Sequence, residues 1–208
     1  MNLFEEALLS HMGKENLEKV QNCKVGIAGA GGLGSNCAFN LVRSGFKHFV
    51  MADFDVVEFT NLNRQFYFAK HVGRKKVDAL KENLLHINCD LWIETYREKI
   101  ESHNVGDVFK DCDVVVEAFD KAQYKRMIVE HYLNSEKLLV SASGLAGWGK
   151  SDAIQVHRMK ERFYLVGDLE TEVGEDVPPM SPRVNIAAAK QADVVLAYVL
   201  GENPYVKG

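Results

Sequence analysis

The sequence predicts an α/β fold built on a mixed sheet, parallel in its N-terminal half with helices on both faces, and with antiparallel C-terminal strands. Apolar runs typical of buried strands alternate with segments of helical periodicity over residues 24–142. One of these runs enters a glycine-rich turn at residues 29–34, and helical periodicity resumes directly after it. A strand, a glycine turn and a helix in this order are typical of a Rossmann-like domain.

The N-terminal half is expected to contain a helical segment, followed by strands and helices in alternation. Its elements, in order, are a helical segment 1–22, a strand 24–28, a helix 33–44 closed by Gly45, a strand 49–52 ending at Asp53, an irregular segment 54–73, a helix 74–88 and a strand 91–96. An irregular segment of this length inside a compact domain is usually functional.

The C-terminal half continues the alternation and then changes character. Its expected elements are a short helix 105–109, a strand 114–119 ending at Asp120, a helix 121–134, a strand 138–143, a β-hairpin 153–166 and a loop 167–180. The last helix is expected to have Ser181 as its N-cap, Pro182 at its first position and Gly201 after its end.

Bulk composition fits one soluble domain over residues 1–208. The chain has 47% hydrophobic and 26% charged residues and a net charge of -4, which does not favour a nucleic-acid-binding surface. No apolar stretch approaches the length of a membrane span, and the first residues do not resemble a secretory signal. We therefore expect a cytoplasmic protein with neither a membrane nor a nucleic acid as partner.

The glycine turn predicts a nucleotide site. Glycines at positions 29, 31, 32 and 34 (Gly29, Gly31, Gly32 and Gly34) allow the backbone to approach a phosphate, and the following helix N-terminus offers free N–H groups and a positive dipole. Asp53, at the end of the next strand, can accept hydrogen bonds from ribose hydroxyls. These residues alone leave NAD, FAD, S-adenosylmethionine and ATP open, as well as a tight turn without a ligand.

The segment after Asp53 narrows this choice. Three motifs follow one another here: Asp53-Phe54-Asp55, Asn61-Leu62-Asn63-Arg64-Gln65 and Gly73-Arg74-Lys75-Lys76. They resemble the D-x-D, N-L-x-R-Q and G-x-x-K signature of the ThiF/MoeB/HesA family, relatives of the ubiquitin-activating enzymes. The resemblance covers nearly the whole chain. It implies ATP-dependent adenylation of the C-terminal glycine of a small ubiquitin-like sulfur-carrier protein ending in Gly-Gly. The short form without zinc implies a ThiS-like carrier of thiamine thiazole synthesis.

The chemistry of adenylation assigns expected roles to these residues. Two anionic reactants meet and charge builds on the phosphates, so fixed cations are needed around them. Arg64 can clamp phosphate oxygens in a bidentate manner, and Lys76 can reach them from the first turn of its helix. Asn61 and Gln65 can orient phosphate or ribose without adding charge. Asp55 is expected beside Asp53 in the cofactor site, and either acid could instead be a turn former.

Asp120 is the expected magnesium ligand. It follows a buried strand at the edge where ligand sites of parallel sheets form, and Mg²⁺ at a triphosphate needs a carboxylate. The family motif C-T-D-N implies nucleotide and metal binding here, and this chain has Ala118-Phe119-Asp120-Lys121, which keeps the acid but not its neighbours. Asp120 could also be the N-cap of the next helix. ATP and Mg²⁺ are thus the expected cofactors.

Three departures from the family pattern shape the remaining expectations. The four cysteines, Cys23, Cys37, Cys89 and Cys112, form no CxxC pair, so no zinc is expected. No cysteine follows Cys112, which indicates adenylation without a covalent thioester. Residues 1–42 contain no arginine that could serve a partner's site, so the expected homodimer rests on the resemblance. The resemblance also implies that the crossover loop 167–182 covers the carrier's tail.

Two other functions stay open. A non-catalytic relative could hold a nucleotide or a carrier without chemistry. An NAD-dependent oxidoreductase would use residues 29–34 and Asp53 in the same way, but it leaves Asn61, Arg64, Gln65 and Lys76 without a role.

Overall fold

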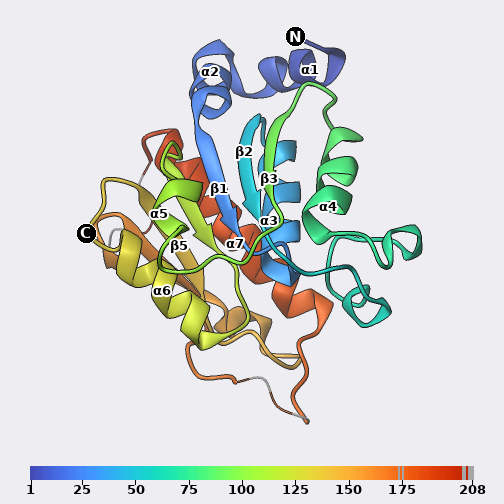
Figure 1. Cartoon of the computed structure of the whole chain (residues 1–208). Coiled ribbons are helices and arrows are strands. Elements are labelled where there is room, and N and C mark those ends of the chain that lie inside the picture. The colour runs from blue at the N-terminus through green and yellow to red at the C-terminus, as the bar shows by residue number, and fades with distance from the viewer. Residues whose placement is uncertain (173, 175, 203–204, 206–208) are drawn as a thin grey trace.

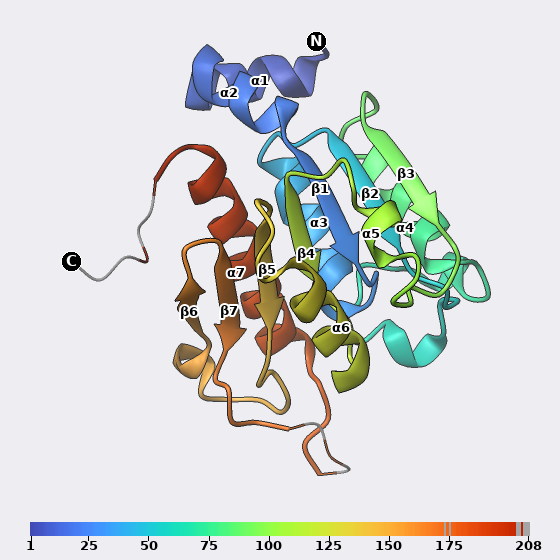
Figure 2. The ribbon, with the colours of Figure 1, turned by 60° about the vertical axis from the view of Figure 1, so that its left-hand side comes forward.

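The fold is centred on one seven-stranded sheet (Figure 1), whose strand order β3-β2-β1-β4-β5-β7-β6 can be followed in Figure 2. The computed structural model describes residues 1–172, 174, 176–202 and 205. The strands are β1 Lys24–Ala28, β2 His48–Ala52, β3 Trp92–Tyr96, β4 Val114–Glu117, β5 Leu138–Ala142, β6 Gln155–Lys160 and β7 Phe163–Gly167. All neighbours pair in parallel except β6 and β7. The predicted mixed α/β fold is confirmed, and its antiparallel part is the β6–β7 pair.

Helices cover both faces of this sheet (Figure 2). On one face lie α3 Gly32–Arg43, α4 Lys76–Leu85 and α7 Ser181–Val199, and on the other lie α5 Val105–Val108 and α6 Ala122–Tyr132. Two apolar clusters correspond to the two faces, one built around α3, α4 and α7 and the other around α5 and α6. Every residue of β4 is buried because helices shield it from both sides.

The N-terminal segment is two helices, not the single helical stretch predicted for residues 1–22. Helix α1 spans Leu3–Met12 and α2 spans Lys14–Asn22. Gly13 separates them with φ +79, a conformation that glycine adopts at low cost. The two helices lie at the amino ends of the strands (Figure 1). There the buried carboxylate of Glu5 accepts a hydrogen bond from Asn88 Nδ2 at 3.1 Å and pairs with Lys47 Nζ at 2.6 Å.

The start of α7 corrects another prediction. The N-cap is Met180, which has an extended backbone and whose carbonyl oxygen accepts the Val184 N–H at 3.3 Å. Ser181 is therefore the first helical residue and not the cap, and Pro182 is the second. The Ser181 hydroxyl instead accepts a hydrogen bond from Asn185 Nδ2 at 3.0 Å. Gly201 follows the helix with φ +81, as predicted for its C-terminal end.

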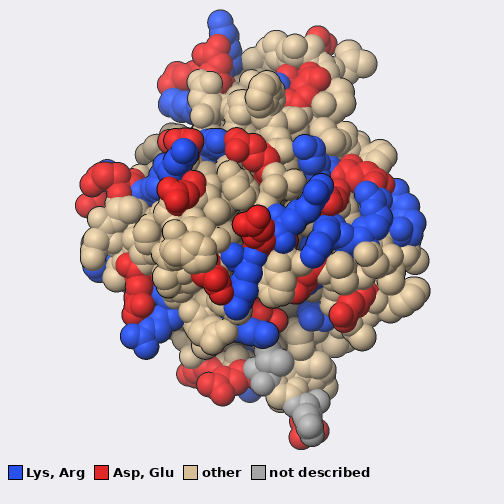
Figure 3. Space-filling model, viewed as in Figure 1, with Lys and Arg blue, Asp and Glu red and all other residues tan. Residues whose placement is uncertain are grey.

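Surface charge and helix hydropathy bear on the expected partners. Lys and Arg side chains are interspersed with Asp and Glu over the face seen in Figure 3 and do not form one continuous basic stripe. Across the described ranges, none of the helices combines the length and apolar character that a bilayer span requires.

Candidate active site

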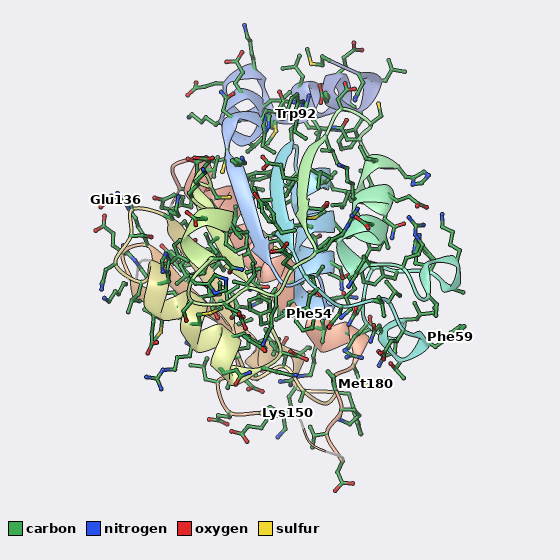
Figure 4. All side chains as sticks on the ribbon, in the orientation of Figure 1. Phe54, Phe59, Trp92, Glu136, Lys150 and Met180 are labelled. Atoms are coloured by element: carbon green, nitrogen blue, oxygen red, sulfur yellow. The ribbon has the colours of Figure 1, made fainter. Side chains whose placement is uncertain are left out.

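The candidate site lies where the strand order reverses. The chain leaves β1 toward α3 and β2, on one side of β1, whereas β4 pairs with β1 on the other side. In an open parallel sheet, ligands bind outside the carboxyl ends of the strands at such a point. The glycine turn follows β1, Asp53 follows β2 and Asp120 lies just beyond β4. Phe54, Phe59, Lys150 and Met180 lie at this end of the molecule, and Trp92 lies at the opposite end (Figure 4).

The four glycines have different surroundings. Gly29 has φ +102, and a Cβ there would lie 2.8 Å from the Ala118 carbonyl oxygen. A Cβ at Gly34 would overlap the Gly29 carbonyl oxygen, and one at Gly32 would lie 2.9 Å from Val184 Cγ1. Gly29 and Gly32 let the turn pack against the residue after β4 and against α7, and Gly34 lets the start of α3 lie close to Gly29.

Gly31 is the one of these four glycines at which a Cβ would make only ordinary van der Waals contact. The nearest atom to a Cβ there would be Gln65 Nε2 at 3.8 Å. Gly31 is also the N-cap of α3, and no side chain caps this helix. An uncapped N-terminus can bind an anion through its N–H groups and dipole. The N-terminus of α3 beside Gly31 is therefore a candidate phosphate site.

Asp53 locks the glycine turn to the end of β2. Its side chain is buried, and its two carboxylate oxygens accept the Ala30 N–H at 2.7 Å and the Asp55 N–H at 2.9 Å. Burial raises the pKa of this carboxyl group, and Lys76 and the two backbone amides oppose that effect. Each oxygen keeps a second lone pair, so the predicted hydrogen bond from a ribose hydroxyl is chemically open to it.

Lys76 is held beside the glycine turn. It is the first residue of α4, and its buried ammonium group pairs with Asp55 Oδ2 at 2.9 Å. The Tyr67 hydroxyl donates toward the Ala30 carbonyl oxygen at 2.7 Å and lies 3.2 Å from that of Lys76, so it links α4 to the turn. Lys75 instead donates to the Phe54 carbonyl oxygen at 2.5 Å. This geometry favours Lys76 over Lys75 for the phosphate role.

Arg64 lies over the start of α3. Its backbone carbonyl oxygen accepts Asn36 Nδ2 at 2.8 Å, and its Cγ is 3.5 Å from where a Gly32 Cβ would lie. The guanidinium donates to the Thr60 carbonyl oxygen at 3.2 Å and to Asn63 Oδ1 at 2.7 Å. Burial lowers the pKa of Arg64, and the negative charge of Asp120 opposes that shift. The two charges therefore lie within electrostatic range of each other.

Asn61 and Gln65 differ in how free they are. The Asn61 side-chain oxygen accepts the Glu58 N–H at 3.0 Å, so it holds its own short 3-10 turn, Phe59–Asn61. Gln65 is buried, and its Oε1 has no hydrogen-bond partner among the described residues. A buried amide oxygen without a partner, next to Gly31, is a place where a ligand donor would be satisfied.

Asp120 is exposed in the turn between β4 and α6. The N-cap of α6 is Lys121, so the alternative of Asp120 as a helix cap is wrong. Within the described part of the chain, no three His, Cys, Asp or Glu side chains gather closely enough to hold a metal. One carboxylate nevertheless fits Mg²⁺, which is commonly bound through one or two carboxylates together with substrate phosphates and water.

The loop before α7 crosses this edge of the sheet (Figure 2). Gly147 N–H donates to the Pro178 carbonyl oxygen at 2.9 Å, and Asn63 Nδ2 donates to that of Pro179 at 3.4 Å. The loop therefore bridges two other segments of the site. Positions 173 and 175 of the predicted crossover loop lie outside the described residues.

Arg183 is a site-forming residue that sequence reasoning missed. Its buried guanidinium pairs with Asp168 and donates to the carbonyl oxygens of Gly149 and Lys150, both at 3.2 Å. Burial of Asp168 is outweighed by its bonds to Thr171, to backbone amides and to Arg183, which together hold its pKa below the ordinary value. The available signal was a lone arginine beside the apolar stripe of the last helix.

The thiols lie away from this edge or are buried. Cys23, Cys89 and Cys112 precede β1, β3 and β4 at the amino ends of the strands, and Cys37 is buried within α3. Burial raises the pKa of Cys23 and of Cys112 to about 12. Cys89 is the exposed thiol of the four.

Two curated proteins each match about two thirds of this chain. SUMO-activating enzyme subunit 2 of Dictyostelium discoideum is 33% identical over 143 residues, covering 68% of this chain and 22% of that protein. Adenylyltransferase and sulfurtransferase MOCS3 of Culex quinquefasciatus is 31% identical over 141 residues, covering 67% of this chain and 32% of that protein. The chain thus spans a third or less of the length of these two relatives.

Solved structures match the fold over nearly the whole chain. The ATP complex of E. coli tRNA N6-threonylcarbamoyladenosine dehydratase, TcdA, has a TM-score of 0.80 at 20% identity, covering 94% of this chain and 91% of that one. E. coli MccB with AMPCPP and MccA has a TM-score of 0.73 at 21% identity, covering 96% and 64%. The ThiF family model matches residues 4–207. The chain therefore belongs to the ThiF family.

Proposed function

We propose that this protein uses ATP to adenylate the C-terminal glycine carboxylate of a small ubiquitin-like sulfur-carrier protein. The observation that carries the proposal is the gathering of three segments around one glycine turn. Lys76 is linked to the turn through Tyr67, Arg64 lies over the start of α3, and the Asp120 charge acts on Arg64. A dinucleotide-binding domain has no need for this set of charges.

The chemistry follows from these charges. A carboxylate oxygen of the carrier attacks the α-phosphorus of ATP, a new C–O–P link forms, and pyrophosphate leaves with the electron pair of the broken P–O bond. Arg64 and Lys76 stabilise the charge that develops on the phosphate oxygens. Asp53 and Gln65 orient the nucleotide. Mg²⁺, held by Asp120 and the phosphates, would neutralise the leaving pyrophosphate.

The comparisons support the class of reaction and of partner. The relatives named above include a SUMO-activating subunit and an adenylyltransferase, and ubiquitin-like modifier-activating enzyme 5 of Caenorhabditis elegans is 31% identical over 71% of this chain and 38% of that protein. We further propose a ThiS-like carrier, thiamine thiazole synthesis, a homodimer and a cytoplasmic location. These finer points rest on the family resemblance and on composition.

The test is ATP–pyrophosphate exchange with candidate carriers that end in Gly-Gly. We expect exchange that requires both Mg²⁺ and a carrier, and we expect it to disappear when the carrier's terminal glycine is deleted. The truncated carrier is the matched control because its folded body is unchanged. ATP binding without exchange for any carrier would instead support a non-catalytic relative. A melting temperature that rises with NAD but not with ATP would support an oxidoreductase.

A further inference from the structure

An ion pair between a fully buried carboxylate and a partly buried lysine lies next to the turn that carries Asp120. Glu117 is the last residue of β4 and is fully buried at the centre of the sheet. Its Oε2 lies 3.0 Å from Lys125 Nζ and also accepts the Ser141 hydroxyl. Burying the carboxylate costs free energy that an ion pair recovers only with good geometry and further hydrogen bonds. Apolar side chains would fill this position without that cost, so the pair calls for a role.

Glu117 and Lys125 lie on either side of the turn in the sequence. Glu117 ends the strand, Lys125 lies in the first turn of α6, and Asp120 is between them in the chain. Glu117 Oε1 accepts the Phe119 N–H at 2.7 Å, which fixes the backbone immediately before Asp120. The turn is thereby fastened at both ends through one carboxylate.

Neighbouring elements hold the Glu117–Lys125 pair in place. Lys125 also donates to the Ala142 carbonyl oxygen at the end of β5, at 2.9 Å. From α7, on the other face of the sheet, Gln191 Nε2 donates to the Glu117 carbonyl oxygen at 3.2 Å. Four elements therefore fix a turn whose outermost acid, Asp120, makes no hydrogen bond or ion pair with any described residue. The backbone that carries the Asp120 carboxylate is thus held by the contacts of its neighbours.

We propose that Glu117 and Lys125 are positioning residues that hold Asp120 where it binds Mg²⁺ together with the phosphates of ATP. This inference rests on the proposed function. A single carboxylate ligand has no neighbouring ligand to correct its direction, so its backbone must be rigid before the metal arrives. We do not place Glu117 or Lys125 in contact with the reactants, because Glu117 is fully buried and the Lys125 ammonium group is bound to Glu117 and to the Ala142 carbonyl oxygen.

The experiment is calorimetric titration of the full chain with ATP, with Mg²⁺ and with EDTA. In Lys125→Met, the gain in ATP affinity that Mg²⁺ provides should fall by roughly 10-fold or more, the usual effect of removing a support behind a metal ligand. Affinity without Mg²⁺ should stay within about twofold of the unmodified chain. Arg126→Met is the matched control, because Arg126 is the next residue of α6 and pairs in solvent with Glu130 at 2.7 Å. It should change neither affinity.

Conservative variants separate positioning from packing. Glu117→Gln keeps an oxygen that can accept the Phe119 N–H, so it should lose less of the Mg²⁺ effect than Glu117→Ala. If Lys125→Met fails to fold, the double variant Glu117→Gln/Lys125→Met removes both charges together and should show the same loss of the Mg²⁺ effect.

Two results would overturn the inference, and they differ in meaning. If Lys125→Met or the double variant folds and keeps the full gain in ATP affinity from Mg²⁺, the Glu117–Lys125 pair does not position Asp120. If Mg²⁺ does not change the ATP affinity of the unmodified chain, Asp120 does not bind the metal, and the Glu117–Lys125 pair has no metal ligand to position. Pyrophosphate exchange with carriers would still test the proposed function separately.

Discussion

Asp53 and Asp55 lie two residues apart and make different contacts. Asp53 accepts two backbone N–H groups and fixes the glycine turn, whereas Asp55 pairs with the ammonium group of Lys76. A buried ammonium group without a partner would be costly, so Asp55 supports the cation of the proposed chemistry. The D-x-D motif therefore joins an acid that shapes the nucleotide site to an acid that holds its lysine.

Thiol reactivity is predicted at the same scale. The thiolate is the reactive form, and burial keeps Cys23 and Cys112 protonated, with pKa values raised to about 12. In the folded protein at pH 8, Ellman's reagent should react rapidly with one thiol, that of the exposed Cys89, and with all four after unfolding. Cys89→Ser should abolish the rapid phase. Rapid reaction of two or more native thiols would contradict the burial of the other three cysteines. A carrier adduct that reducing agents release would contradict adenylation without covalent sulfur chemistry.

At the scale of elements, we expect different glycines of the turn to be needed for folding and for nucleotide binding. A Cβ at Gly34 would overlap the Gly29 carbonyl oxygen, so Gly34→Ala should lower the melting temperature strongly. At Gly31 the nearest atom to a Cβ is 3.8 Å away, so Gly31→Ala should melt close to the unmodified protein and bind ATP more weakly. Thermal unfolding and nucleotide titration of both variants check this. Equal melting temperatures, or unchanged ATP affinity in Gly31→Ala, would contradict the assignment.

The order of strands and helices was predictable because each has its own periodicity and turn residues. The break at Gly13 was not, since the apolar stripe of residues 1–22 continues on both sides of it. Met180 carries no cap-forming side chain, so the pattern pointed to Ser181 one residue later. The pairs Asp168–Arg183 and Glu117–Lys125, each with one buried partner, were also missed. A charged residue in an apolar run shows that a partner is needed but not which one packs beside it.

Over the whole molecule, the site is a product of strand order. β2, β1 and β4 are neighbours, so the residues that follow them meet at one edge of the sheet, and the sequence could predict that Asp53, the glycine turn and Asp120 converge. The paths of residues 54–73 and of the crossover loop depend on contacts such as Asn63 with Pro179, which carry no local pattern. The tail channel of the carrier could not be predicted for the same reason.

The central claim is that Arg64, Lys76 and Asp120 act together on a triphosphate above the glycine turn. The most direct measurement is ATP–pyrophosphate exchange in single variants at saturating carrier. Arg64→Ala and Lys76→Ala should each reduce exchange by roughly 100-fold, equivalent to about 3 kcal/mol of transition-state stabilisation. Asp120→Ala should act through the Mg²⁺ dependence, and Lys75→Ala, whose side chain donates to the Phe54 carbonyl oxygen, should leave exchange unchanged. Full exchange in all three site variants, or an equal loss in Lys75→Ala and Lys76→Ala, would contradict it.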